Sequence, residues 1–436
     1  MNQVIMLSLI GLIGAIAVLM ILAYKNWSTI IYSALAALIV CVFSGMEPWD
    51  GLINNWAKGT GNYVATWLIL FAAGSIFGKI YQESGAAATI ASTLAKTFGE
   101  KNAIIPILLS SVILGMSGIS SFVLIFCIYP IALDLFAKAN MSKRLLPAVF
   151  CYSVWTVAAV APGSAQATNL IPMNILGTTA MAGAVPGFVF AIVVAVVNTL
   201  YIGYESKKLA AHGIFFEDHD SVKRGEDEQL PGLIPALIPI AVVIVGFNVF
   251  HWPVEIALVL GILLAIVLFF KNIKLSKWVE TLTEGATTSV GVLMTTSVIV
   301  GFGAVVVLTP VYGIVMQWVS NSSMNPYLLA AIAANVFALI LGSATSSVNL
   351  SMQTLGPVFI EYGAQGYNLG FIHRIISQAA MGLDTLPHCG ALLVVFAVCG
   401  VNHKLSYKYC FVTTVLVPVA VTFLIQLPLC MILDKF

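Results

Sequence analysis

The chain has 436 residues, of which 60% are hydrophobic and 8% charged, and its formal net charge is +1. A soluble domain carries about 25% charged residues, so the composition excludes an ordinary soluble protein and indicates a polytopic membrane protein. The charge is too small for a nucleic-acid partner, and the seven cysteines show neither a disulfide framework nor metal-ligand spacing, so we expect no cofactor.

Apolar runs long enough to cross a bilayer, which takes about 20 residues, follow one another along the chain. The run from residue 4 to 24 has no positive residue before it and is long enough to span, so we expect no cleavable signal peptide. The predicted spans are 4–24, 28–46, 60–82, 146–171, 178–203, 231–251, 254–270, 285–309, 371–400 and 409–433.

Two further apolar stretches, 103–138 and 327–361, each divide at a centre rich in Gly and Ser. The first centre reads "GMSGISS", from Gly115 to Ser121, and the second reads "GSATSSVN", from Gly342 to Asn349. Several of the flanking arms are too short to cross comfortably. Each stretch is therefore predicted to be a re-entrant hairpin with its tip near the midplane.

Spans 146–171 and 371–400 are themselves interrupted, by "APGSAQATN" and "GLDTLPHCG". Pro removes an amide donor and Gly loosens the turn, so we expect broken helices there. Non-helical backbone at membrane depth is tolerated only where it is buried in protein or lines a cavity. Two such breaks, each following a polar hairpin tip, favour a binding site over simple packing kinks.

The one clearly aqueous segment, 204–230, is predicted to be a cytoplasmic linker between the halves 1–203 and 231–436. With the N-terminus outside and both hairpins returning to their own side, only Lys58, Arg374 and Lys435 of the 19 Lys and Arg residues fall outside. This asymmetry agrees with the excess of positive residues in cytoplasmic loops. We expect Arg374 near an outer helix end and His373 solvated beside it.

The halves repeat the same order of elements. Gly59 pairs with Gly285, Gly115 with Gly342 and Pro130 with Pro357, among other pairs separated by 225–228 residues. The first half starts outside and the second inside, so the repeats are inverted, as in secondary transporters that bind substrate at the midplane on broken helices. The predicted fold class is an all-α polytopic membrane protein with two inverted-topology repeats, about ten spans and two re-entrant hairpins.

Several stretches resemble a known family. "GLDTLPHCGALLVVFAVCG" followed by "NHKLSYK", with "APGSAQATNLIP" and "GTTAMAGAVPG", is similar to the gluconate/proton symporter (gluconate permease) family of the ion-transporter superfamily, in the branch of 3-hydroxybutyrate permease-like proteins. The resemblance covers essentially the whole chain. That family has a stretch rich in His and Pro in its gluconate branch where this chain reads "VAAVAPGSAQATN", which points to a carboxylate shorter than gluconate.

The resemblance implies a transporter rather than an enzyme. It implies uptake of a small organic acid anion with protons across the inner (plasma) membrane of a bacterium. The superfamily also implies a homodimer in which a mobile transport domain moves against a scaffold domain, as an elevator does.

The anion has to be held without a strong fixed cation, because no Lys lies deep within an apolar core. Hydroxyls, backbone N–H groups and the N-termini of half-helices can bind it instead, although each hydroxyl could equally bond to its own helix backbone. The candidate contacts lie at the hairpin tips and breaks: Ser117, Ser120, Ser121, Gly163, Ser164, Gln166, Asn169, Thr345, Ser346, Ser347, Asn349 and Thr385.

Asp384 and His388 are four residues apart and would share a face if the turn were helical. An Asp at bilayer depth costs about 2.5–3.5 kcal/mol on insertion scales and marks a functional site by default, and histidine changes charge near physiological pH. We expect this pair to couple transport to protons. The alternative is a static ion pair that holds the break open.

Three other functions remain open from the sequence. Sodium could be the coupling ion, because unwound carbonyls and hydroxyls also hold Na⁺. Ser117 and His388 could form the nucleophile and base of an intramembrane serine hydrolase, although a hydrolase would not explain the repeat. The protein could also be a passive channel, which would not accumulate solute against its gradient.

Overall fold

The computed structural model describes residues 3–25, 27–99, 102–217, 230–321, 324–387 and 389–435, and every regular element within these residues is a helix. A chain that crosses a bilayer must satisfy its backbone polar groups internally, and helices do so within one segment. The predicted all-α fold is therefore confirmed.

The first half contains both long and interrupted helices. They are α1 (Gln3–Tyr24), α2 (Thr29–Phe43), α3 (Pro48–Asp50), the π-helix η1 (Gly51–Ala57), α4 (Lys58–Glu83), α5 (Ala86–Phe98), α6 (Ile104–Met116), α7 (Ser121–Lys138), η2 (Lys143–Leu145), α8 (Leu146–Phe150), the π-helix η3 (Cys151–Ala158), α9 (Ala167–Leu176) and α10 (Ala184–Ala211).

The second half also contains both long and short helices. Its elements are α11 (Leu233–Asn248), α12 (Val254–Phe269), η4 (Leu275–Lys277), α13 (Trp278–Val306), α14 (Pro310–Asn321), α15 (Pro326–Leu341), α16 (Ala344–Ala364), α17 (Leu369–Ala379), α18 (Gly390–Val398), α19 (His403–Phe411), η5 (Val412–Leu416), α20 (Val417–Val421), η6 (Thr422–Gln426) and α21 (Leu427–Leu433).

Five stretches of helix among the described residues are long and apolar enough to cross a membrane: Gln3–Leu22, Pro48–Glu83, Ala184–Ala211, Leu275–Val306 and His403–Leu433. The predicted spans 28–46, 231–251 and 254–270 are helices of only 15 or 16 residues. Helix α10 continues to Ala211, beyond the predicted start of the linker at 204, and linker residues 218–229 lie outside the described residues.

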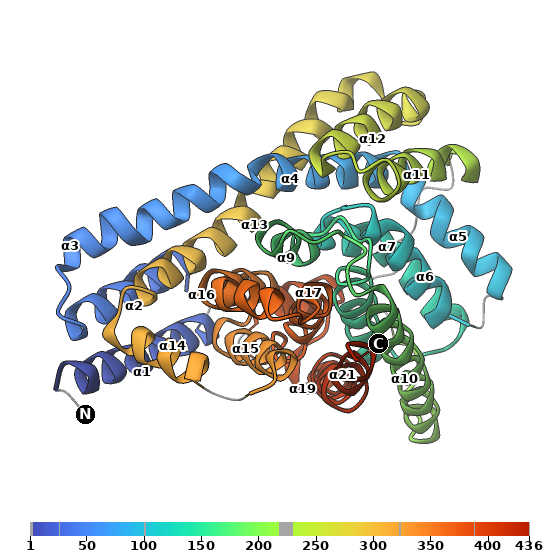
Figure 1. Ribbon diagram of the computed structural model, residues 1–436. Helices are drawn as coiled ribbons and strands as arrows, with labels where there is room; N and C mark the ends of the chain where they lie inside the picture. The colour runs from blue at the N-terminus through green and yellow to red at the C-terminus, as the bar shows by residue number, and fades with distance from the viewer. Residues whose placement is uncertain are drawn as a thin grey trace.

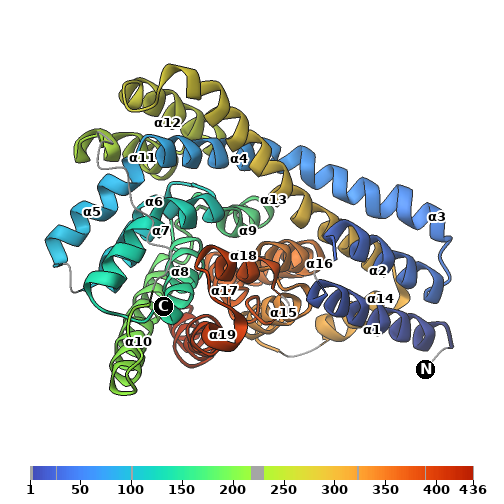
Figure 2. The ribbon, with the colours of Figure 1, turned by 180° about the vertical axis from the view of Figure 1, so that it is seen from behind.

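The two long helices α4 and α13 run side by side along one side of the molecule, with α11 and α12 packed near one end of the pair (Figures 1 and 2). Glycine permits the close crossing: a Cβ atom on Gly301 would lie 2.3 Å from the carbonyl oxygen of Trp56. A second contact between α4 and α13 is an ion pair: Lys79 of α4 pairs with Glu284 of α13 at 2.8 Å, and also with Glu83 of its own helix at 3.1 Å. These contacts make the two helices one continuous wall.

Both predicted hairpins are present as helix pairs: α15 with α16 near the centre of the molecule, and α6 with α7 beside α5 (Figure 1). Each pair turns on a glycine with left-handed backbone, Gly118 at φ 85° and Gly342 at φ 57°, a conformation that costs other residues steric strain. Both predicted breaks are present too. Helix is lost between η3 and α9 and between α17 and α18.

Candidate functional site

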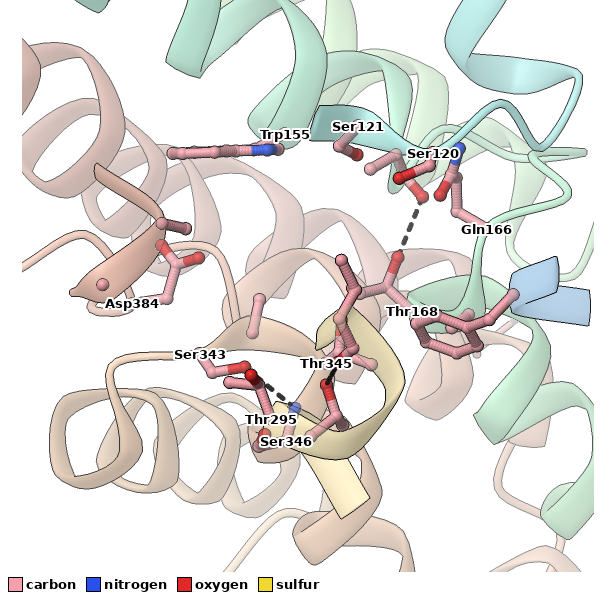
Figure 3. Close-up of a pocket in the computed structure, with 18 of the residues that line it drawn as sticks. Ser120, Ser121, Trp155, Gln166, Thr168, Thr295, Ser343, Thr345, Ser346 and Asp384 are labelled. Carbon is pink, nitrogen blue, oxygen red and sulfur yellow. Dashed lines mark hydrogen bonds between the residues drawn. The ribbon is translucent and has the colours of Figure 1, made fainter. Parts of the chain in front are cut away.

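The two hairpin tips and the two breaks surround one cavity of about 590 Å³. This volume is typical of a small-molecule site. Figure 3 shows Ser120, Ser121 and Gln166 on one side of the space, Ser343, Thr345 and Ser346 on another, and Asp384 across from Gln166. Further lining residues come from α2, α4 and α13, such as Tyr32, Gly74 and Thr295.

Four helices begin at this cavity. The residues that line it include the first residues of α7 (Ser121), α9 (Ala167), α16 (Ala344) and α18 (Gly390). The first turn of a helix has unpaired N–H groups and the positive end of the helix dipole, so its N-terminus attracts anions. Four such ends around one space create a site for negative charge without any Lys or Arg.

Asp384 is the one Asp, Glu, Lys or Arg residue among the described residues that line the cavity. Its side chain is 7% exposed, and its carboxyl lies close to backbone N–H groups that include those of Ala344 and Thr385. Ala344 is the first residue of α16. The carboxyl of Asp384 therefore lies near donors that an incoming anion could also use.

Six of the predicted site residues line the cavity: Ser120, Ser121, Gln166, Thr345, Ser346 and Asp384. Among them, the hydroxyl of Ser346 has no hydrogen-bond partner although it is buried. The side-chain amide of Gln166 donates to the carbonyl oxygens of Gly115 at 2.9 Å and Ile119 at 2.7 Å, which ties the first tip to the first break.

Seven other predicted residues lie behind the cavity wall: Ser117, Gly163, Ser164, Asn169, Ser347, Asn349 and Thr385. Most are engaged elsewhere. Ser117 donates to the Leu114 carbonyl at 2.7 Å, Ser347 donates to the Ala334 carbonyl at 2.6 Å, and Thr385 pairs with Thr414. By contrast, the hydroxyl of Ser164 and the amide nitrogen of Asn349 are buried without a partner.

His388 lies outside the described residues, so its predicted pairing with Asp384 stays a prediction.

The expected solvation of His373 is wrong, and Arg374 beside it in α17 is buried as well. Every residue of α17 from Ile372 to Ala379 is buried, and both side chains are 0% exposed. The ring of His373 bonds to the Thr178 hydroxyl at 2.7 Å through Nδ1 and to Asn169 Oδ1 at 3.0 Å through Nε2. Residues that are distant in the sequence surround α17, and no pattern in the local sequence predicts these contacts.

The candidate list also omitted residues that line the cavity, chiefly Trp155, Thr168, Thr288, Thr295 and Ser343. A signal existed for two of them. Thr288 and Thr295 are seven residues apart in the apolar span 285–309, so they lie on one face of the helix, two turns apart. A stripe of hydroxyls on one face of such a span indicates a polar lining.

Comparison with known proteins shows that the chain belongs to the GntP family of permeases, whose family model matches residues 5–429. It is 28% identical to the uncharacterised transporter YxjC of Bacillus subtilis, over 95% of this chain and 97% of that protein. It is 25% identical to a gluconate permease of Bacillus licheniformis, over 84% and 86% of the two chains. It is 22% identical to the D-serine transporter DsdX of Escherichia coli, over 86% and 87%.

The resemblance found in the sequence is thereby confirmed at the level of the family. The protein is a multi-pass transporter of the bacterial plasma membrane and not an enzyme. Ser117, the nucleophile named in the hydrolase alternative, is buried, and its hydroxyl is bonded to its own helical turn.

Proposed function

We propose that this permease carries a small organic acid anion into the cell together with a proton. The observation that carries the proposal is the cavity at which α7, α9, α16 and α18 all begin, because four helix N-termini provide N–H donors and positive potential for a carboxylate. Relatives named gluconate permeases support an organic acid as the substrate.

Asp384 supplies the coupling in this proposal. Its carboxyl lies against the N-terminus of α16, where the substrate carboxylate would bind. Two negative charges at one buried site repel, so the arriving anion favours protonation of Asp384. By linkage, protonation of Asp384 then favours anion binding to the same degree. Proton and anion therefore cross together, and the moving part carries less net charge through the bilayer.

We further propose an inverted repeat that works by an elevator motion. The contacts between α4 and α13 support the repeat: a Cβ on Gly59 would lie 3.3 Å from Gly301, and one on Gly285 would lie 2.7 Å from Ile76. A pseudo-twofold axis that exchanges the halves would relate two such contacts. The cavity supports the motion, because it is lined both by the hairpins with their breaks and by α2, α4 and α13. A homodimer belongs to the same proposal.

The test is uptake into proteoliposomes with an imposed pH gradient, clamped voltage and no sodium, using a panel of hydroxy and keto acids that includes gluconate. The wild type should concentrate at least one acid. Asp384→Asn should lose this accumulation yet keep exchange of substrate across the membrane, because exchange moves no net proton. An Asp384→Asn protein that still concentrates substrate would show that another group carries the proton. A wild type that only equilibrates the acids would refute proton coupling, and the same assay with a sodium gradient would then separate sodium-coupled transport from passive flow.

A further inference from the structure

Arg374 of α17 is the largest side chain that is completely buried in the described part of the protein. Its guanidinium donates three hydrogen bonds, all to backbone carbonyls: Nε to Ala182 at 2.9 Å, one terminal nitrogen to Val160 at 3.0 Å and the other to Ala180 at 2.9 Å. Val160 lies in the first break, and the other two lie in the loop between α9 and α10.

No carboxylate within the described residues forms an ion pair with Arg374. A buried charge without a counter-ion is costly, so the carbonyl dipoles have to stabilise it. Val160 comes two residues after the end of η3 at Ala158, where the helix dipole is negative. The guanidinium thus lies at the C-terminal end of a half-helix, which is a place that suits a cation.

Two glycines form the slot in which the arginine lies. A Cβ on Gly183 would come within 2.7 Å of the Arg374 Cβ, and one on Gly187 would come within 2.7 Å of its Cδ. Gly183 also has φ of 58°, which disfavours any other residue. Both belong to "GTTAMAGAVPG", a stretch that the substrate cavity does not use.

Neighbouring carbonyls are also occupied by side-chain N–H groups. Gln378 donates to Val160 at 3.3 Å and to Gly187 at 3.0 Å, and Asn169 donates to Ser164 at 2.8 Å and to Ala180 at 3.2 Å. In secondary transporters with broken helices, unwound carbonyls and the C-terminal ends of half-helices coordinate the coupling cation. In this protein, the side chains of Arg374, Gln378 and Asn169 donate hydrogen bonds to those carbonyls.

We propose that Arg374 is a tethered cation that takes the place of a bound sodium ion. It fills a carbonyl cage formed by Val160 of the first break and by Ala180 and Ala182 of the loop between α9 and α10. The break then keeps the geometry that positions the N-terminus of α9 at the cavity without any dissolved cation. The cage shares the first break with the substrate cavity, and the inference rests on the proposed function only for the role of that break in transport. It predicts that the cage binds a small cation when the arginine is removed.

The first experiment separates charge from hydrogen bonding. Arg374→Lys keeps a cation in the slot, whereas Arg374→Gln keeps two N–H donors without charge, and Lys274→Ala removes an exposed cation as the control. We expect uptake by Arg374→Lys to stay within about threefold of the wild type and uptake by Arg374→Gln to fall about tenfold or more, since hydrogen bonds from charged donors are the stronger ones. If Arg374→Gln transports as well as Arg374→Lys, charge is not required and the proposal is wrong.

The second experiment measures cation binding directly, with no need for a substrate. The melting temperature of purified Arg374→Ala and of the wild type is compared in sodium, potassium, guanidinium and choline chloride at equal ionic strength. Sodium or guanidinium should raise the Tm of Arg374→Ala by about 2 °C or more relative to choline, beyond any shift in the wild type. Equal Tm shifts in the variant and the wild type would overturn the inference.

The results of these two experiments can be told apart from a failure of the proposed function. A wild type that does not concentrate organic acids refutes proton-coupled uptake but leaves the Tm comparison decisive for the cage. If Arg374→Ala cannot be purified in any of the salts, the comparison of Arg374→Lys with Arg374→Gln by Tm decides, because the cage requires the neutral variant to be the less stable one.

Discussion

Replacing Gln166 tests whether the first hairpin tip has to be held in place for substrate to bind. Its amide makes two hydrogen bonds, to Gly115 and to Ile119, and each is worth about 0.5–1.5 kcal/mol. Gln166→Ala therefore removes about 1–3 kcal/mol that fixes the tip. Because Ser120 and Ser121 line the cavity from this tip, we expect substrate affinity to fall by about 5- to 150-fold.

Gln166→Glu should be worse at high pH, because an ionised carboxylate would face two carbonyl oxygens and the substrate anion. Acidic pH should restore part of the affinity, since a protonated carboxyl donates one hydrogen bond. Affinity is measured by calorimetry on the purified protein and as KM in proteoliposomes, with the exposed Gln365→Ala as the control. An affinity of Gln166→Ala within twofold of the wild type at unchanged Tm would refute the reasoning.

Three shorter predictions follow from other contacts. Gly187→Ala should lower the free energy of unfolding by about 1–3 kcal/mol because its Cβ would lie 2.7 Å from Arg374 Cδ; denaturation of Gly203→Ala, where the space is open, is the control. Ser346→Ala should weaken substrate binding more than it changes Tm, because this hydroxyl belongs to a residue that lines the cavity and has no protein partner to lose; unchanged affinity would remove Ser346 from the site. Lys138→Cys should label from inside, against a low background because all seven native cysteines are buried; labelling from outside would refute the inverted repeat.

The sequence was sufficient to predict the class of protein, the two hairpins and the two breaks. The reason is local. A bilayer demands long apolar helices, and the places where helix stops are marked by residues whose own backbone requires it, such as Gly118 and Gly342 with positive φ and Pro162 in the first break. A helix begins after each tip and after each break, so four helix N-termini lie at one cavity where the tips and breaks meet.

The sequence could not tell which polar side chains face that cavity. Ser346 and Ser347 are adjacent in the sequence, yet Ser346 lines the cavity while Ser347 bonds to Ala334 behind it. Neighbours on a helix point about 100° apart, so the choice depends on how α16 is rotated against the helices around it. Only packing sets that rotation.

Tertiary structure alone decided the environment of α17. His373 and Arg374 are polar residues near the end of an apolar run, which in a membrane protein usually indicates the water interface. Arg374 instead reaches carbonyls 192 to 214 residues away in the chain, at Ala182, Ala180 and Val160. A charge can be buried so deeply only where the rest of the fold provides such dipoles, and their positions depend on how distant segments pack together.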